Sequence, residues 1–200
     1  MLCQLSTVKA RLGFDDFDVK YDVLLTNAIA AISSRFDKET NRTLSRTVNV
    51  TFEFCAVDME ICVPCYPIEA ISKFETKSSE SEGWFEQTGI DFLIRRSCII
   101  SLSSPLCHSL STINPRPSTC RLTFTGGYVL PGNTPGPGQN PLPPDLEQAA
   151  VEQVAFWFQI RDKLGLKTRW PHGGTYEGFL PLDLLPNVQT ILKRYERYTL

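Results

Sequence analysis

The residues that could do chemistry in this sequence are mainly cysteines and histidines. Cys62 and Cys65 are separated by Val and Pro, and two thiols at this spacing can share a metal ion or form a small disulfide ring. A structural zinc site needs two more ligands, and the sequence offers one other close pair, Cys107 and His108. A redox motif of this kind normally opens a helix, whereas Pro64 lies in strand-like sequence. We therefore expect no metal and no cofactor. The remaining isolated candidates are Cys55, Cys98, Cys120 and His172.

A thiol hydrolase is a second possibility, built from one cysteine, His108 or His172, and an Asp or Asn. Most chains of this length contain such residues, so their presence is not specific. The glycine pairs at 126–127 and 173–174 do not begin a phosphate-binding pattern and are interpreted as turns with positive φ. We predict that the protein is not an enzyme and has no catalytic residues. A small enzyme that uses Cys62, Cys65, Cys107 or His108 is kept as the alternative.

Composition limits the classes of partner. The 200 residues are 42% apolar, so the chain can bury a proper core in one domain or in two small ones. The formal net charge of −2 argues against coating nucleic acid through a general positive field. No apolar run approaches the roughly 20 residues that cross a bilayer. Seven cysteines, an odd number, fit reduced buried thiols in a cytoplasm better than a disulfide framework.

The N-terminal part has helical periodicity. Residues 5–12 are predicted to form a short helix that Ser6 or Thr7 caps and Gly13 ends. A second helix is predicted from about Val19 to Thr40, with the aspartates at 15, 16 and 18 as its cap. The apolar residues that share one face of this helix are Leu25, Ala28, Ile29, Ile32 and Phe36.

From Thr47 the apolar period changes to two residues, which is typical of a half-buried strand. Further strands are predicted near residues 60–63, 68–76, 92–96, 98–102 and 120–125, with turn-prone sequence between them. Several short strands at this spacing favour an antiparallel sheet or a small sandwich over a parallel array.

The last third begins with a loop rich in proline and glycine, residues 131–144. Pro143 and Pro144 suit the entry and first position of a helix, and Asp145 and Glu147 place negative charge at its positive end. The apolar stripe of this helix runs to Leu164, and Gly165 is expected to end it. Its three consecutive aromatic residues, 156–158, are interpreted mainly as core residues. Rings on opposite faces of a helix nevertheless imply two packing partners, and one of these could be another subunit.

A final helix is predicted from about Pro186. The segment 193–198 has two readings: a solvated helix end whose cations favour the negative end of the dipole, or a docking peptide with aromatic and arginine anchors.

Together these patterns predict an α+β protein. We expect the N- and C-terminal helices to form one bundle, with an antiparallel β-rich domain inserted between them. The expected division is 1–46 for the N-terminal helices, 47–128 for the inserted β domain, 129–144 for the Pro/Gly-rich loop, and 145–200 for the C-terminal helices and docking tail.

These residues, in this order, resemble the head-to-tail connector, or adaptor, proteins of long-tailed bacteriophages and of related gene transfer particles. The segments that carry the resemblance are residues 5–12 and 15–42, the strand pattern at 66–74, the strand and turn at 122–128, the helix start at 143–149 with Trp157 and Arg161, and the closing helix at 185–195. The family often has a shorter middle, so residues 48–125 are expected to be an added domain.

The resemblance implies a structural virion protein at the head–tail junction, assembled in the host cytoplasm. It implies a homo-oligomeric ring, expected to be twelve-fold, between the portal protein and the next neck or tail protein. Genome DNA would pass through the ring without sequence-specific binding, and no membrane is involved. The C-terminal segment would dock on the portal. By resemblance the docking residues are Leu192, Arg194, Tyr195, Arg197 and Tyr198. The alternative within the assembly class is a stopper or tail-completion neck protein.

Overall fold

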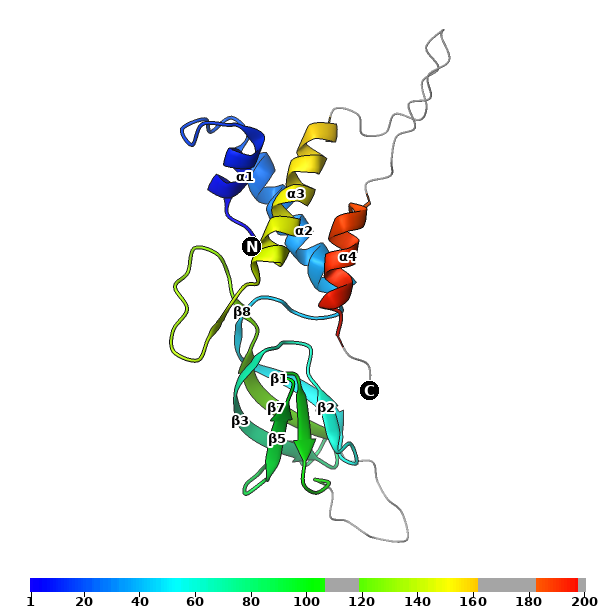
Figure 1. Cartoon of the computed structure of the whole chain (residues 1–200). Helices are drawn as coiled ribbons and strands as arrows, with labels where there is room; N and C mark the ends of the chain where they lie inside the picture. The colour runs from blue at the N-terminus through cyan, green and yellow to red at the C-terminus, as the bar shows by residue number, and fades with distance from the viewer. Residues whose placement is uncertain (107–118, 162–182, 198–200) are drawn as a thin grey trace, which may run out of the picture. The chain divides into compact units, whose positions relative to one another are not determined.

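The computed structural model describes residues 1–106, 119–161 and 183–197. The fold is α+β, as predicted, with helices from both ends of the sequence and antiparallel sheets from its middle (Figure 1). The chain divides into two compact units. The helical unit comprises Met1–Thr40, Leu130–Gly132 and Leu142–Glu196, and the β unit comprises Asn41–Val129, Asn133–Pro141 and Arg197–Leu200.

The helical unit contains the four helices that the sequence predicts. They are α1 (Leu5–Leu12), α2 (Asp22–Glu39), α3 (Pro144–Ile160) and α4 (Pro186–Arg194). Helix α3 packs against each of the other three, so it is the central element of this unit. The predicted end of α3 at Leu164 and Gly165 lies outside the described residues. Within the described ranges, no helix combines the length and apolarity that crossing a membrane requires.

The helix ends are partly as predicted. Gly13 follows α1 in the left-handed conformation, with φ of 75°, and Pro144 is the first residue of α3. The predicted side-chain caps are wrong. Ser6 lies inside α1, whose N-cap is Gln4. The Asp15 and Asp18 carboxylates accept hydrogen bonds from amides two residues later and so stabilise the loop before α2.

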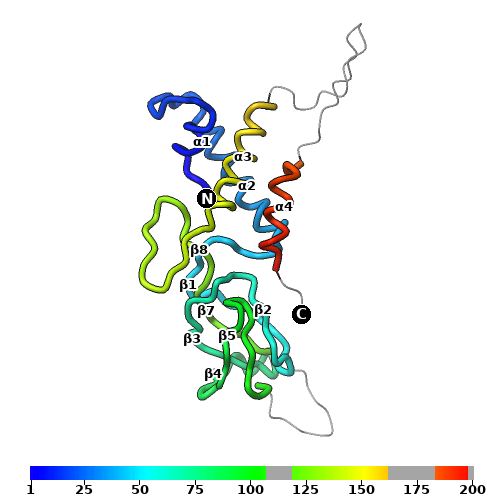
Figure 2. The backbone as a smooth tube through the Cα atoms, viewed as in Figure 1, coloured from blue at the N-terminus to red at the C-terminus, as the bar shows by residue number. Residues whose placement is uncertain are grey.

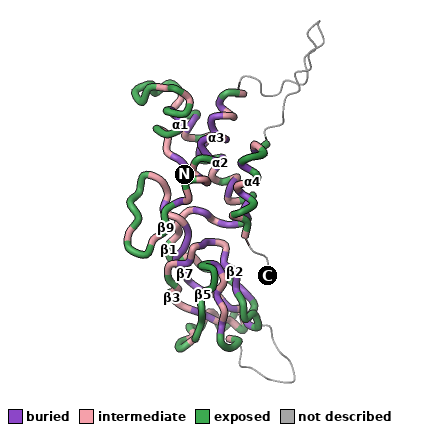
Figure 3. Tube along the Cα trace, in the orientation of Figure 1, coloured by how far each residue is buried: buried purple, intermediate pink, exposed green. Residues whose placement is uncertain are grey.

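The core of the helical unit is formed by the predicted apolar faces (Figure 3). The small residues Ala149, Ala150 and Ala155 allow the neighbouring helices to approach α3 closely. Most of α3 is therefore buried or partly buried. Burial of these side chains supplies the main driving force for this unit. The fully or almost fully buried residues include Val8, Leu25, Ile29, Ile32, Phe36, Leu146, Ala149, Ala150, Val154, Val188 and Leu192.

The β unit contains two antiparallel sheets. The larger has the order β1 (Thr47–Cys55), β7 (Thr119–Gly126), β3 (Ile68–Lys77) and β4 (Phe85–Gln87). The smaller has the order β2 (Glu60–Cys62), β6 (Ile99–Leu102) and β5 (Phe92–Arg95). Inward-facing side chains of both sheets make one hydrophobic cluster, which includes Phe54, Ile61, Phe74, Ile100, Leu122 and Phe124. The predicted strands and their antiparallel pairing are confirmed, and β4 was not predicted.

The turn after β7 requires glycine for two different reasons. Gly127 has φ of 98°, as predicted for a turn glycine. Gly126 is still part of β7, and a Cβ there would lie 2.6 Å from the carbonyl oxygen of Cys65. The prediction of positive φ is therefore right for Gly127 and wrong for Gly126, where close backbone approach is the reason.

The Pro/Gly-rich loop is a surface excursion that leaves after β8 (Tyr128–Val129) and returns at β9 (Asn140–Pro141), as Figure 2 shows. These two short strands pair in parallel, Tyr128 opposite Asn140 and Val129 opposite Pro141. The pairing closes the base of the loop, which the sequence pattern did not indicate.

Candidate assembly surfaces

The five predicted docking residues have different environments. Leu192 is buried in the helical unit, whereas Arg194 is exposed at the last residue of α4. The Tyr195 hydroxyl donates a hydrogen bond to Asp145 Oδ1 over 2.7 Å. Arg197 belongs to the β unit, where its guanidinium donates to the carbonyl oxygen of Cys62 and lies 5.3 Å from the centre of the Phe52 ring. Tyr198 lies outside the described residues.

Polar contacts hold the start of α4 against α3. Gln153 of α3 is fully buried, and its Oε1 accepts a hydrogen bond from the Leu185 amide over 2.8 Å. Its Nε2 donates to the Asp183 carbonyl oxygen over 3.3 Å. The Asp183 carboxylate in turn accepts from Arg35 of α2 at 2.8 Å. This role of Gln153 could not be predicted from the sequence, because a glutamine on an apolar helix face does not indicate its hydrogen-bond partners.

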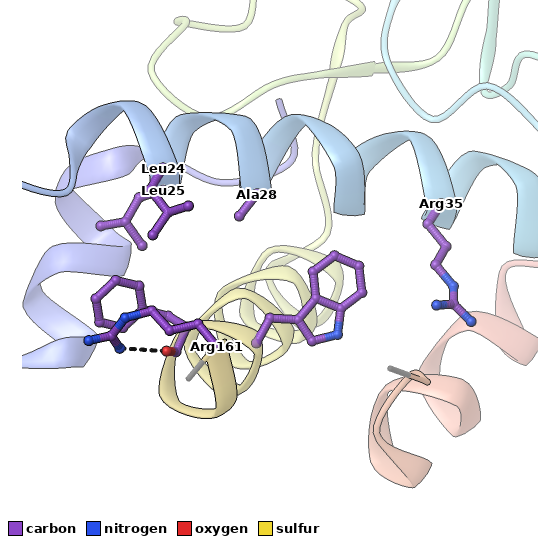
Figure 4. Close-up of a pocket in the computed structure, with 7 residues that line it drawn as sticks. Leu24, Leu25, Ala28, Arg35 and Arg161 are labelled. Carbon is purple, nitrogen blue, oxygen red and sulfur yellow. Dashed lines mark hydrogen bonds between the residues drawn. The ribbon is translucent and has the colours of Figure 1, made fainter. Parts of the chain in front are cut away.

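An apolar groove lies between α2 and α3 (Figure 4). It has a volume of about 390 Å³ and is lined by Leu24, Leu25, Ala28, Arg35, Trp157, Phe158 and Arg161. The indole N–H of Trp157 is buried and has no hydrogen-bond partner among the described residues. A buried donor left in this way costs free energy.

Arginines lie at both ends of the apolar groove. Arg161 Nη1 donates to the Phe158 carbonyl oxygen over 2.6 Å, and its guanidinium lies over the Phe158 ring, 3.9 Å from its centre. Arg35 lies at the other end of the groove, toward α4 (Figure 4), and pairs there with Asp183 at 2.8 Å and Glu39 at 3.4 Å. The groove therefore combines an apolar floor with one cationic end, at Arg161.

The loop between α1 and α2 and the first turn of α2 expose apolar side chains. In the loop, Phe17 is 92% exposed, although aspartates flank it on both sides, and Val19 is 72% exposed. In α2, Val23 is 76% exposed and Leu24 is half exposed. Among the described residues of the helical unit, these four and Met1 are the large hydrophobic residues that are exposed. The apolar periodicity did not predict this surface, and the available signal was a phenylalanine between aspartates.

A charge cluster crosses the larger sheet of the β unit. Glu75 of β3 pairs with Arg121 of β7 at 2.8 Å and with Lys73 at 3.0 Å. Burial of Glu75 raises its pKa, but hydrogen bonds from Lys73 and Arg121 outweigh burial, so the net pKa is lowered. Arg121 also lies 4.2 Å from the centre of the Trp84 ring. This arrangement stabilises the sheet and presents no open site.

The cysteine pair that suggested metal or redox chemistry is packed into the β unit. Cys62 and Cys65 are both buried and unbridged, and the Cys65 thiol donates to the Gly126 carbonyl oxygen over 3.2 Å. Among the described residues, no group of three His, Cys, Asp or Glu side chains is placed to hold a metal ion. Cys107, His108 and His172 lie outside the described residues.

Burial makes two described thiols poor nucleophiles. The pKa of Cys3 is raised to about 12, mainly by burial and in smaller part by the nearby Glu147 carboxylate, against the lowering effect of the N-terminal ammonium. Burial also raises the pKa of Cys98, with a smaller contribution from the neighbouring Cys62. A thiolate forms at neither position near neutral pH.

No family model and no curated protein matches this chain. Solved structures that share its fold include the following two. A chain of the structure described as the neck of an empty GTA particle computed with C6 symmetry aligns with a TM-score of 0.58 and 13% identity, over 100% of this chain and 91% of that one. A chain of the virion of a native gene transfer agent (GTA) particle aligns with a TM-score of 0.55 and 15% identity, over 98% and 89%. At these identities the likeness establishes the shared fold.

Proposed function

We propose that this chain is a structural subunit of a virion neck, specifically a head-to-tail adaptor. Copies of it would form a ring between the portal and the next neck or tail protein and would continue the DNA channel. The protein would act in the virion at the head–tail junction and would catalyse no reaction.

The observation that supports this proposal most strongly is the extent of the fold likeness. Both units and nearly the full length of the chain align with a chain from a particle neck, rather than one common domain alone. A fold by itself does not fix function, but a two-unit arrangement of helices and sheets over the whole chain is far more restrictive than one widespread domain.

The surface of the helical unit also suits a ring subunit. A ring needs two different patches on each copy, because each subunit contacts its neighbours head to tail. The helical unit has an exposed apolar loop at Phe17 and an apolar groove between α2 and α3, and the two adjoin at Leu24. Exposed apolar side chains of this kind commonly mark protein–protein contacts.

We propose that the portal is contacted by the segment that follows Leu192. Arg194 is exposed, and Tyr195 and Arg197 carry an aromatic ring and a guanidinium, the groups that most often anchor interfaces. Leu192 would contribute by anchoring α4 within the helical unit, since its side chain is buried. Arg197 would exchange its bond to the Cys62 carbonyl for a contact with the portal.

The test is cryo-electron microscopy of the purified full-length protein mixed with its cognate portal-bearing, DNA-filled, tailless heads. We expect a ring of new density directly below the portal, with the C-terminal segment of each subunit against it. Density that appears only after a separate adaptor has been added would instead identify a stopper or tail-completion protein. Failure to bind at the portal vertex in either condition would reject a neck function.

A further inference from the structure

The loop formed by residues 15–19 and the groove between α2 and α3 are complementary to each other. The loop surface is formed by Phe17 and Val19, with carboxylates at Asp15, Asp16 and Asp18. The groove has an apolar floor and ends at Arg35 and Arg161. We propose that the 15–19 loop of one copy inserts Phe17 into the α2/α3 groove of a neighbouring copy. This inference rests on the proposed ring and assigns its subunit contact.

Size and polarity favour this occupant. A groove of about 390 Å³ accommodates an aromatic side chain together with part of its loop. Phe17 packs against no described core residue of its own chain, being 92% exposed, so its insertion removes a large apolar surface from water at little structural cost. A foreign partner would have to supply the same combination of ring and carboxylates that this chain already carries.

The charges agree in sign at the Arg161 end of the groove. The carboxylates that flank Phe17 would lie beside the Arg161 guanidinium, whose Nη1 donates to the Phe158 carbonyl oxygen. Arg35, at the other end, already pairs with two carboxylates of its own chain, Asp183 at 2.8 Å and Glu39 at 3.4 Å, so this end of the groove is not counted in the charge argument. Such complementarity fixes the orientation of the two subunits.

The Trp157 side chain forms part of the floor of the same groove. Its indole N–H is buried and has no partner among the described residues, so it is not counted as a donor to the inserted loop. Trp157 would contribute apolar contact to the Phe17 ring.

The loop begins and ends at one end of the groove. Phe14 and Tyr21, at the two ends of the loop, have ring centroids 5.5 Å and 5.1 Å from that of Phe158, which lines the groove (Figure 4). Phe17 itself is 92% exposed, so it does not fill the groove of its own chain. In a closed ring every copy would insert its Phe17 into one neighbour and receive the Phe17 of the other.

Photo-cross-linking tests the contact directly. The full-length chain would carry benzoylphenylalanine at position 17, and a matched sample would carry it at Val57, which is 68% exposed on the β unit. Each is mixed with isotope-labelled unmodified protein, assembled on cognate tailless heads and irradiated. We expect position 17 of one copy to cross-link to residues 24–28 or 157–161 of another copy, and position 57 not to do so.

The other outcomes of the cross-linking experiment separate failure of the groove contact from failure of the adaptor proposal. If a ring assembles but position 17 cross-links to a different protein, to residues 162–182 of its own chain, or to nothing, the groove contact is rejected and the adaptor proposal stands. If no ring assembles on the heads, both proposals fail. In a parallel assay, Phe17→Asp should weaken assembly about ten- to a hundredfold. Trp157→Phe should weaken it several-fold, and Val57→Asp should leave it unchanged.

Discussion

At the scale of single residues, the environment of each titratable group decides whether it is structural or reactive. Most of the thiols that suggested enzyme chemistry are buried, and the Cys65 thiol donates a hydrogen bond to a backbone carbonyl oxygen. Glu75, a buried carboxylate that pairs with two cations, joins two strands of the larger sheet. Both observations describe residues that stabilise a folded unit.

Cysteine reactivity should follow burial. In a Cys107→Ser background, we expect iodoacetamide at pH 8 to modify Cys55 first, because Cys55 is exposed and the other described cysteines are buried. Cys3 should react slowest or among the slowest, since burial raises its pKa to about 12. Peptide mass spectrometry of timed samples measures the order. Fast modification of Cys62 or Cys65 in the folded protein would contradict this packing and would revive the thiol-enzyme alternative.

Glu75→Gln should destabilise the β unit by about 1–3 kcal/mol at pH 7, because the charged hydrogen bonds from Lys73 and Arg121 are lost. The pKa of Glu75 is lowered in the folded state, so its contribution is fully present above the unfolded value of about 4.3. It is lost as the pH falls through the lower, folded pKa.

The difference in unfolding free energy between wild type and Glu75→Gln should therefore shrink below about pH 4. Urea denaturation at several pH values measures this difference. Glu53→Gln is the matched control, since Glu53 lies opposite Arg121 on the other neighbouring strand but is exposed. A destabilisation that did not change with pH would show that the Glu75 charge has no part in it.

At the scale of elements, the helical unit depends on how α3 holds its neighbours. Small residues let α3 pack closely, and one buried amide fixes the entry to α4. Because Gln153 satisfies one backbone donor and one backbone acceptor, its side chain replaces the cap that α4 lacks.

Gln153→Ala should destabilise the protein by about 2–3 kcal/mol, since it leaves the Leu185 amide and the Asp183 carbonyl without these bonds. Gln148→Ala on the same helix is the control, because Gln148 is exposed and its side chain donates to Glu152 one turn away. Equilibrium denaturation followed by helical circular dichroism compares the two. Equal small losses would mean that Gln153 does not hold α4.

At the scale of the whole molecule, two units share one chain that enters and leaves the β unit at several points. The helical unit ends with Glu196 and the β unit resumes at Arg197, so the C-terminal segment belongs to both. This is the segment that is proposed to dock on the portal.

Deleting residues 193–200 should leave a folded subunit that no longer joins DNA-filled heads. Leu192 remains to anchor α4, and the loss of the Tyr195 bond to Asp145 should lower the melting temperature by a few degrees. Tyr195→Phe is the control, because it removes the hydroxyl that bonds Asp145 but keeps the ring that is proposed to dock; it should still join heads. Tailed, infectious particles from the deletion variant would overturn the docking assignment.

The sequence by itself determined the order and type of the main elements. Apolar periods of 3.6 and two residues identified the helices and most strands, and Pro144 and Gly13 marked two helix ends, because these are local properties of the backbone. Short strand pairings such as β8 with β9 could not be predicted from the sequence, since two-residue strands show no apolar periodicity.

Only the tertiary structure decided which side chains are buried together and which stay exposed. The sequence could not show that Gln153 caps α4, that Glu75 joins two strands, or that Phe17 stays exposed while Trp157 buries an unpaired donor. Each depends on residues far apart in the chain, and distant contacts are set by packing rather than by local preference. The assembly surfaces therefore appeared only when the helices were placed against one another.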